Sequence, residues 1–220
     1  MNVLIIAPHT GDEVLGCGGT ISRLIDEDIS VYVAIVTKGM PPNFTTDTAI
    51  QEKANVLEVH EYLGITETFF LDFPALGLDT VPHNELNESL QDLISSLSPE
   101  MMFIPFVSDL NKDSQQTFFS SLVSTKPDYE NYPKTVYAYE TLSNTNWNAS
   151  YLTTGFQPNV YFDISDHLTK KLKAFSMCQD KVMESPHERS LNTLKSLAIL
   201  RGSTVYKHAA EAFVMIREVV

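Results

Sequence analysis

Residues 3–20 read VLIIAPHTGDEVLGCGGT, and this stretch decides the fold. An unbroken apolar run ends in a polar cluster, and a glycine-rich segment then opens a helix. A buried strand of a parallel sheet has such a continuous apolar run, and it delivers polar groups to the sheet edge where ligands bind. The stretch therefore predicts an α/β, Rossmann-like fold, doubly wound, with a mostly parallel sheet flanked by helices.

His9 and Asp12 lie three residues apart in the turn that we expect after this strand. Imidazole and carboxylate groups both bind borderline cations such as zinc. The pair is therefore a candidate metal site, although an ordinary hydrogen-bonded turn could contain the same two residues. For Glu13 we expect a role at the helix start, as a cap or as a charge that favours the helix dipole.

Residues 8–13, PHTGDE, resemble the first motif of the PIG-L/LmbE family of zinc-dependent N-deacetylases, Ala/Pro-His-Pro-Asp-Asp-Glu. The resemblance, which extends over essentially the whole chain, implies that His9 and Asp12 are zinc ligands. It also places Gly11 where the family has its general base. Glycine has no side chain and cannot move a proton, so the base is missing from this motif.

Residues 109–114, DLNKDS, resemble the family's second motif, Asp-x-His-x-Asp-His. Asp109 and Asp113 match, and Asp113 would tune the assisting group. Asn111 stands where the family has an assisting His, and an amide can stabilise an oxyanion but cannot shuttle a proton. Ser114 stands where the family has its third zinc ligand, and a hydroxyl is a poor ligand beside imidazole. Asn111 and Asp113 are therefore the candidate catalytic residues.

The altered residues affect the base, the acid and the third ligand together. Amide hydrolysis needs zinc to acidify water, a base to take its proton and an acid for the leaving amine. We therefore favour a non-catalytic or repurposed family member that binds an N-acetyl-sugar-like ligand or a protein partner. One alternative is a metal-dependent N-deacetylase of GlcNAc-type substrates, a hydrolase of linear amides, with a remodelled site. The last is a Rossmann-like nucleotide binder, for which the glycines of residues 16–19 are weak support.

We expect zinc to bind weakly or not at all, and another divalent metal stays an alternative. Asp113 could move in as a replacement ligand, because a His/Asp/Asp set suits manganese or magnesium as well as zinc. His83, in the loop after the third expected strand, is the other stand-in that we consider. The remaining histidines show no ligand spacing.

The composition is that of a globular protein, with 220 residues, 43% hydrophobic and 20% charged, and we expect one domain over residues 1–220. The net charge of −13 argues against a nucleic-acid surface. Neither a membrane-spanning run nor a signal peptide is evident, so we expect a cytoplasmic location. Cys17 and Cys178 are too few for a disulfide framework and are expected to be buried. The resemblance also implies that homo-oligomers can form.

Strand and helix patterns alternate along the first half of the chain. We expect strands at residues 2–8, 30–38, 66–70 and 101–106, helices at 13–27, 48–62, 84–97 and 114–124, and an apolar loop at 71–78. The second half predicts strands at 135–142 and 160–164, a helix at 165–183 and a packed tail at 206–220. A last helix is expected to begin with a capping box of Ser185, Pro186 and Glu188 and to stop at Gly202.

Overall fold

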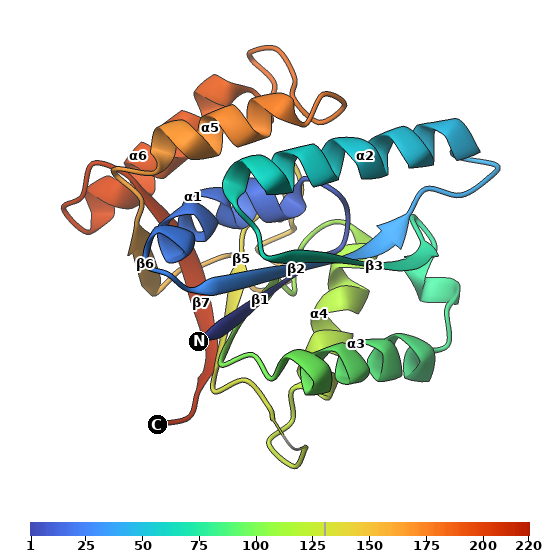
Figure 1. Ribbon diagram of the computed structural model, residues 1–220. Helices are drawn as coiled ribbons and strands as arrows, with labels where there is room; N and C mark the ends of the chain where they lie inside the picture. The colour runs from blue at the N-terminus through green and yellow to red at the C-terminus, as the bar shows by residue number, and fades with distance from the viewer. Residues whose placement is uncertain (130) are drawn as a thin grey trace.

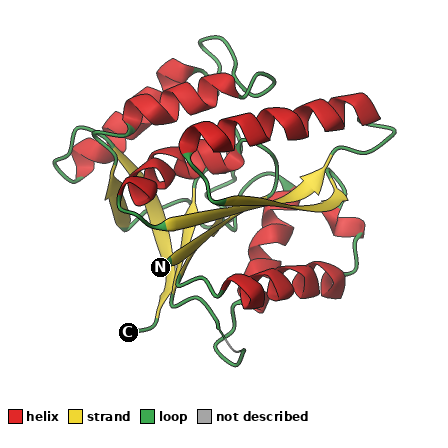
Figure 2. Ribbon diagram, viewed as in Figure 1, coloured by secondary structure: helices red, strands yellow, loops and turns green. Residues whose placement is uncertain are grey.

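A seven-stranded sheet runs through the computed structural model, which describes residues 1–129 and 131–220, and helices cover both faces of this sheet (Figure 1 and Figure 2). The strands are β1 (Asn2–Ala7), β2 (Ser30–Lys38), β3 (Glu67–Pro74), β4 (Met101–Pro105), β5 (Thr135–Tyr139), β6 (Val160–Asp163) and β7 (Ala210–Glu218). The expected α/β fold is confirmed.

The strand order is β3-β2-β1-β4-β5-β7-β6. Neighbouring strands from β3 to β5 are all parallel, whereas β7 is antiparallel to both β5 and β6. The order reverses between β1 and β4, since the chain passes outward from β1 to β3 and then returns to the other side. In doubly wound sheets such a reversal leaves a crevice at the carboxyl ends of the two strands, and ligands bind there.

The helices form two layers around the sheet (Figure 1). One layer contains α1 (Asp12–Asp26), α2 (Thr46–Leu63), α5 (Leu168–Met177) and α6 (Leu191–Thr204), and the other contains α3 (His83–Leu97) and α4 (Lys112–Ser124). Successive side chains of a strand point to opposite faces. In β1, Val3 and Ile5 pack towards the first layer, and Leu4 and Ile6 pack towards the second. This explains why β1 is apolar throughout.

Close packing accounts for two of the glycines near the start of α1. A Cβ atom on Gly16 would lie 2.8 Å from Cγ of Tyr139, and one on Gly19 would lie 2.6 Å from Cδ1 of Ile164. Both distances are far below van der Waals contact. The glycines therefore bring α1 against the sheet.

A buried ion pair joins α1, α5 and β7. Lys171 of α5 pairs with Glu211 of β7, and its Nζ atom also donates to the carbonyl of Leu15, 2.7 Å away. Glu211 in turn accepts hydrogen bonds from the backbone N–H groups of Gly19 and Thr20, at 2.9 and 2.6 Å. Buried charges are tolerated when they are paired and hydrogen-bonded in this way. The network fixes the middle of α1 against the last strand.

The predicted helices after residue 165 are wrong in part. The first one ends early, at Met177, and the capping box at Ser185 does not form. Instead Ser190 is the N-cap of α6, and its side chain accepts from the backbone N–H of Thr193 at 3.3 Å. Both serines fit a capping pattern, but only Ser190 directly precedes the positions that face the core, beginning with Leu194. Residues 178–190 consequently form turns that lie beside the sheet edge.

Other boundaries also differ from the prediction. Gly202 does not stop α6, because the helix continues to Thr204 and the glycine lets the backbone of Ala209 approach; a Cβ atom would lie 2.6 Å from the Ala209 Cα atom. Part of the expected apolar loop, up to Pro74, belongs to β3, and the strand expected at 135–142 ends at Tyr139. The tail is packed as expected, and its strand β7 was not predicted.

Two smaller expectations can be compared with the structure. Cys17 and Cys178 are free and buried, as predicted. Within residues 1–129 and 131–220, none of the helices combines the length and apolar character that a bilayer crossing requires.

Replacing Gly16 with Ala should lower the free energy of unfolding by about 1–3 kcal/mol, the usual cost of overpacking. The loss should occur although Ala is the better helix former by about 1 kcal/mol. The Tyr139 ring cannot move away, because it is fully buried and its hydroxyl donates to the carbonyl of Ile6 at 2.9 Å. Urea unfolding measures the change. Gly155→Ala, in an open loop, is the control, and a Gly16→Ala protein as stable as the wild type would contradict the packing argument.

Candidate ligand site at the sheet edge

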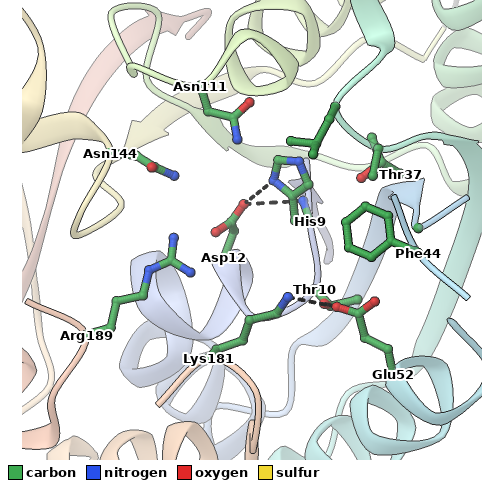
Figure 3. A pocket seen from close by; sticks show the side chains of 13 residues that line it. His9, Thr10, Asp12, Thr37, Phe44, Glu52, Asn111, Asn144, Lys181 and Arg189 are labelled. Carbon is green, nitrogen blue, oxygen red and sulfur yellow. Dashed lines mark hydrogen bonds and ion pairs between the residues drawn. The ribbon is translucent and has the colours of Figure 1, made fainter. Parts of the chain in front are cut away.

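A pocket opens where the strand order reverses, at the carboxyl ends of β1 and β4 (Figure 3). Its cavity of about 220 Å³ is lined by His9, Thr10, Asp12, Thr37, Gly39, Phe44, Glu52, Ala75, Leu76, Asn111, Asn144, Lys181 and Arg189. Pockets for drug-sized ligands typically measure roughly 300–1,000 Å³. This pocket therefore suits a small polar ligand.

The centre of the pocket is His9, which is held between two carboxylates. Its Nδ1 atom lies 3.2 Å from Oδ2 of Asp12, and its Nε2 atom lies 2.9 Å from Oδ2 of Asp113. Burial lowers the pKa of His9, but the hydrogen bonds to Asp113 and Asp12 outweigh it and raise the pKa to about 9. His9 is consequently a cation at neutral pH.

Asp113 also holds the loop after β3. Its carboxylate accepts from the backbone N–H groups of Leu76, at 2.6 Å, and Leu78, at 3.2 Å. Burial raises the pKa of Asp113, but the bonds from His9 and the two backbone groups outweigh it and lower the pKa below its ordinary value. Asp113 thus contacts the Nε2 atom of His9, whereas Asp12 contacts the Nδ1 atom. To become a replacement metal ligand on the Asp12 side, Asp113 would have to break all three of its hydrogen bonds.

The donors around His9 do not fit a zinc site. Asp113 contacts the far nitrogen of His9, in the orienting position that carboxylates take behind metal-bound histidines. His9 and Asp12 are then the donors that share one side, since Gly11 has no side chain and Ser114 offers only a hydroxyl. Catalytic zinc takes three protein ligands and structural zinc takes four. In the part of the chain that the structure describes, no three His, Cys, Asp or Glu side chains are grouped so that they could hold a metal.

Asn111 and His83 are the other candidate residues, and the structure separates them. The Oδ1 atom of Asn111 accepts from the backbone N–H of Asp113 at 2.9 Å, which makes Asn111 the N-cap of α4. Its amide nitrogen faces the pocket (Figure 3). His83 is exposed at the start of α3 and does not line the pocket. The structure therefore brings Asn111 to the site, but not His83.

Gly11 has a backbone conformation that favours glycine. Its φ angle is +90°, in the left-handed region, and a Cβ atom there would meet Cγ of Lys181 at 3.2 Å. The N–H group of Gly11 donates to the carboxylate of Glu13, with distances of 2.9 and 3.2 Å to the two oxygens. Glu13 therefore caps the start of α1, one of the two roles expected of it. It is buried, and the Nε2 atom of His60 lies 3.2 Å from its Oε1 atom.

Several pocket residues escaped the sequence analysis. Lys181 Nζ lies 2.8 Å from Oε1 of Glu52, and the hydroxyl of Thr10 donates to the same oxygen at 2.6 Å. Arg189 and Asn144 come from the segments before α6 and after β5. Lys181 and Arg189 lie in segments that the sequence predicts to be helical, but α5 ends before Lys181 and α6 begins after Arg189. No motif in the sequence marked any of these residues.

Comparison with known proteins identifies the family. A match to PIG-L, described as GlcNAc-PI de-N-acetylase, covers residues 4–119, from β1 into α4, and includes both motifs. The chain belongs to the PIG-L family. The resemblance inferred from the motifs is thereby confirmed.

The relatives of this PIG-L protein include named deacetylases. The "Uncharacterized deacetylase YaiS" of Escherichia coli (strain K12) is 29% identical over 78% of this chain and 87% of its own length. The diacetylchitobiose deacetylase of Thermococcus kodakarensis is 25% identical over 91% of this chain and 77% of its own. The crystal structure of the conserved protein TT1542 from Thermus thermophilus has the same fold, with a TM-score of 0.79 and 23% identity over 99% of this chain and 96% of that one.

Asp109, beside the pocket, should make the protein less stable as the pH rises from about 4 to 7. Burial raises the pKa of its carboxyl to about 7, although a hydrogen bond from the Asn111 N–H opposes the rise. In that range the folded protein holds a proton that the unfolded chain has released, so stability falls with rising pH, by at most about 1.4 kcal/mol per pH unit.

Asp109→Asn should flatten this decline, and urea unfolding at pH 4.5, 5.5 and 6.5 measures it. Asp79→Asn, at an exposed carboxylate in the short 3-10 helix Leu78–Thr80, is the matched control and should keep the wild-type profile. An unchanged slope in Asp109→Asn would show that another group causes the pH dependence.

Proposed function

We propose that this protein is a non-catalytic or repurposed PIG-L member whose pocket binds an N-acetyl-sugar-like ligand. The observation that carries the proposal is the donor set around His9. Both ring nitrogens of His9 are hydrogen-bonded to carboxylates. Gly11 supplies no general base, and Ser114 supplies no imidazole nitrogen as the third metal ligand.

The steps of amide hydrolysis lack suitable groups in this pocket. A water molecule beside the ligand would find no general base at Gly11. Asn111 can donate a hydrogen bond from its amide nitrogen, but it has no titrating proton for a leaving amine. The chain's own residues are therefore suited to bind and orient a ligand more than to move protons. For this reason we do not favour the alternative, a metal-dependent N-deacetylase with a remodelled site.

A sugar-like ligand agrees with the size and polarity of the pocket. Carboxylates of Asp12 and Glu52 can accept from hydroxyl groups, and Asn111 can donate to an oxygen of the ligand. Phe44 and Leu76 supply apolar surface at the rim, against which the carbon face of a sugar ring can pack. The Thermococcus kodakarensis relative is named for diacetylchitobiose, which is built of N-acetyl sugars.

The proposal also includes the domain organisation, the cellular location and the assembly of the protein. We propose that residues 1–220 form one domain, that the protein is cytoplasmic and that it can form homo-oligomers. A protein partner in place of the sugar is the second candidate occupant.

Wild-type protein purified without chelator and then supplied with zinc should hold far less than one zinc per chain. It should also release no acetate from N-acetylglucosamine. The triple variant Gly11→Asp, Asn111→His, Ser114→His should gain near-stoichiometric zinc and measurable acetate release, because it restores base, acid and third ligand. Aspartate adopts the left-handed conformation of position 11 more readily than most residues do. Mass spectrometry of the metal and an acetate assay are the measurements.

The matched control, Gly11→Asn, Asn111→Gln, Ser114→Thr, imposes similar steric changes without the new chemistry and should gain neither property. Stoichiometric zinc with turnover in the wild type would overturn the proposal in favour of a remodelled enzyme. A triple His/Asp variant that folds but binds no zinc would show that the second motif has been matched to the wrong residues.

A further inference from the structure

Arg189 brings a cation with unused hydrogen-bond donors into the pocket. Its Nε atom donates to the hydroxyl of Ser143 at 2.7 Å. Its two terminal nitrogens donate to no acceptor, and it forms no ion pair, among residues 1–129 and 131–220. Figure 3 shows the guanidinium pointing across the pocket towards Asp12. These nitrogens are therefore available to a ligand.

The other cations of the pocket are already matched by carboxylates. Lys181 pairs with Glu52, and His9 lies between Asp12 and Asp113. Arg189 is therefore the cationic lining residue without a carboxylate partner in the described chain. An arginine in this state favours an anionic ligand group over a neutral one, because an ionised partner roughly doubles the strength of a hydrogen bond.

The segment that carries Arg189 is fixed in place before any ligand binds. The neighbouring Glu188 accepts hydrogen bonds from the side chains of Asn146, at 2.6 Å, and Trp147, at 2.9 Å. The backbone N–H of Arg189 donates to Nδ1 of His187 at 3.0 Å. These contacts join the segment before α6 to the loop after β5. A preorganised arginine loses less conformational entropy when it binds.

Two amide side chains face the same space as Arg189. Asn111 has its Oδ1 atom engaged by Asp113, which leaves the amide nitrogen turned into the pocket. The backbone N–H of Asn144 donates to the carbonyl of Thr141 at 3.2 Å, and its side chain lines the pocket. In Figure 3 both amides point towards the region that the guanidinium enters. A planar guanidinium with flanking amides can pair with both oxygens of a carboxylate.

We propose that Arg189, together with Asn111 and Asn144, binds a carboxylate group of the ligand, so that the pocket selects N-acetyl sugars that carry an acidic substituent. This inference rests on the proposed function, because it takes the rest of the ligand to be an N-acetyl sugar. Glu52, which pairs with Lys181, and Asp12, towards which the guanidinium points, would accept from the neutral hydroxyl groups (Figure 3).

The test compares N-acetylglucosamine with N-acetylmuramic acid, the same sugar with a lactyl ether on O3 that carries one carboxylate. Titration calorimetry gives both dissociation constants. Fluorescence of Trp147, the single tryptophan, reports binding near Arg189, because its indole nitrogen donates to Glu188. The wild type should bind the acidic sugar about tenfold more tightly or better, as expected for a hydrogen-bonded charge pair. Added salt should reduce this preference.

Arg189→Gln should abolish the preference, because the affinity for the acidic sugar should fall about tenfold more than the affinity for N-acetylglucosamine. Arg189→Lys should restore part of the preference, since it keeps the charge but loses the planar pair of donors. Arg23→Gln is the matched control. Arg23 lies at the other end of α1, where it pairs with Glu27 at 2.8 Å, and its loss should leave the preference unchanged. Urea unfolding checks that each variant is folded.

The possible failures are distinguishable. Equal affinity of the wild type for both sugars would overturn the carboxylate subsite and leave the proposed function standing. A preference that survives in Arg189→Gln would assign the anion to a different residue and overturn the role of Arg189. If the wild type binds neither sugar, the proposed function fails, and this inference fails with it.

Discussion

His9 is held between carboxylates that come from the starts of two different helices, Asp12 of α1 and Asp113 of α4. The helices cover opposite faces of the sheet, so this bridge closes the edge where the strand order reverses. Asp113 extends the bridge to the loop after β3 through Leu76 and Leu78. The shape of the pocket depends on this chain of hydrogen bonds.

Much of the fold could be read from the sequence where local pattern and burial agree. β1 is apolar on both faces because helices cover both, and the polar residues at its end could be assigned to the sheet edge. β7 could not be predicted, because its place depends on pairing with β5 and β6 and its short apolar segment has no diagnostic period. Ser185 and Ser190 show the limit for helix starts: two similar caps compete, and burial of the following residues decides between them.

The residues of the candidate site also fall into two groups, those that the sequence predicts and those that it does not. His9, Asp12, Asn111 and Asp113 could be found because they lie in short motifs directly after strands. Lys181 and Arg189 could not, because they lie in turns whose course depends on contacts with distant side chains. For Arg189 these contacts are the hydroxyl of Ser143 and the bonds of its neighbour Glu188. In this protein the sequence motifs identify the residues at the strand ends, and the tertiary contacts add the pocket residues that come from distant segments.

The position of β7 has a consequence for how the protein is made. Among residues 1–129 and 131–220, β6 is hydrogen-bonded into the sheet through β7 alone, which lies between β6 and β5 although it follows both in the sequence. A ribosome releases the chain from its N-terminus, so β6 emerges before the strand that it needs. Glu211 of β7 also completes the ion pair that holds α1, the helix that carries Asp12. The first helix to be synthesised is therefore among the last elements to be secured, and a nascent chain that ends before Glu211 lacks that anchor.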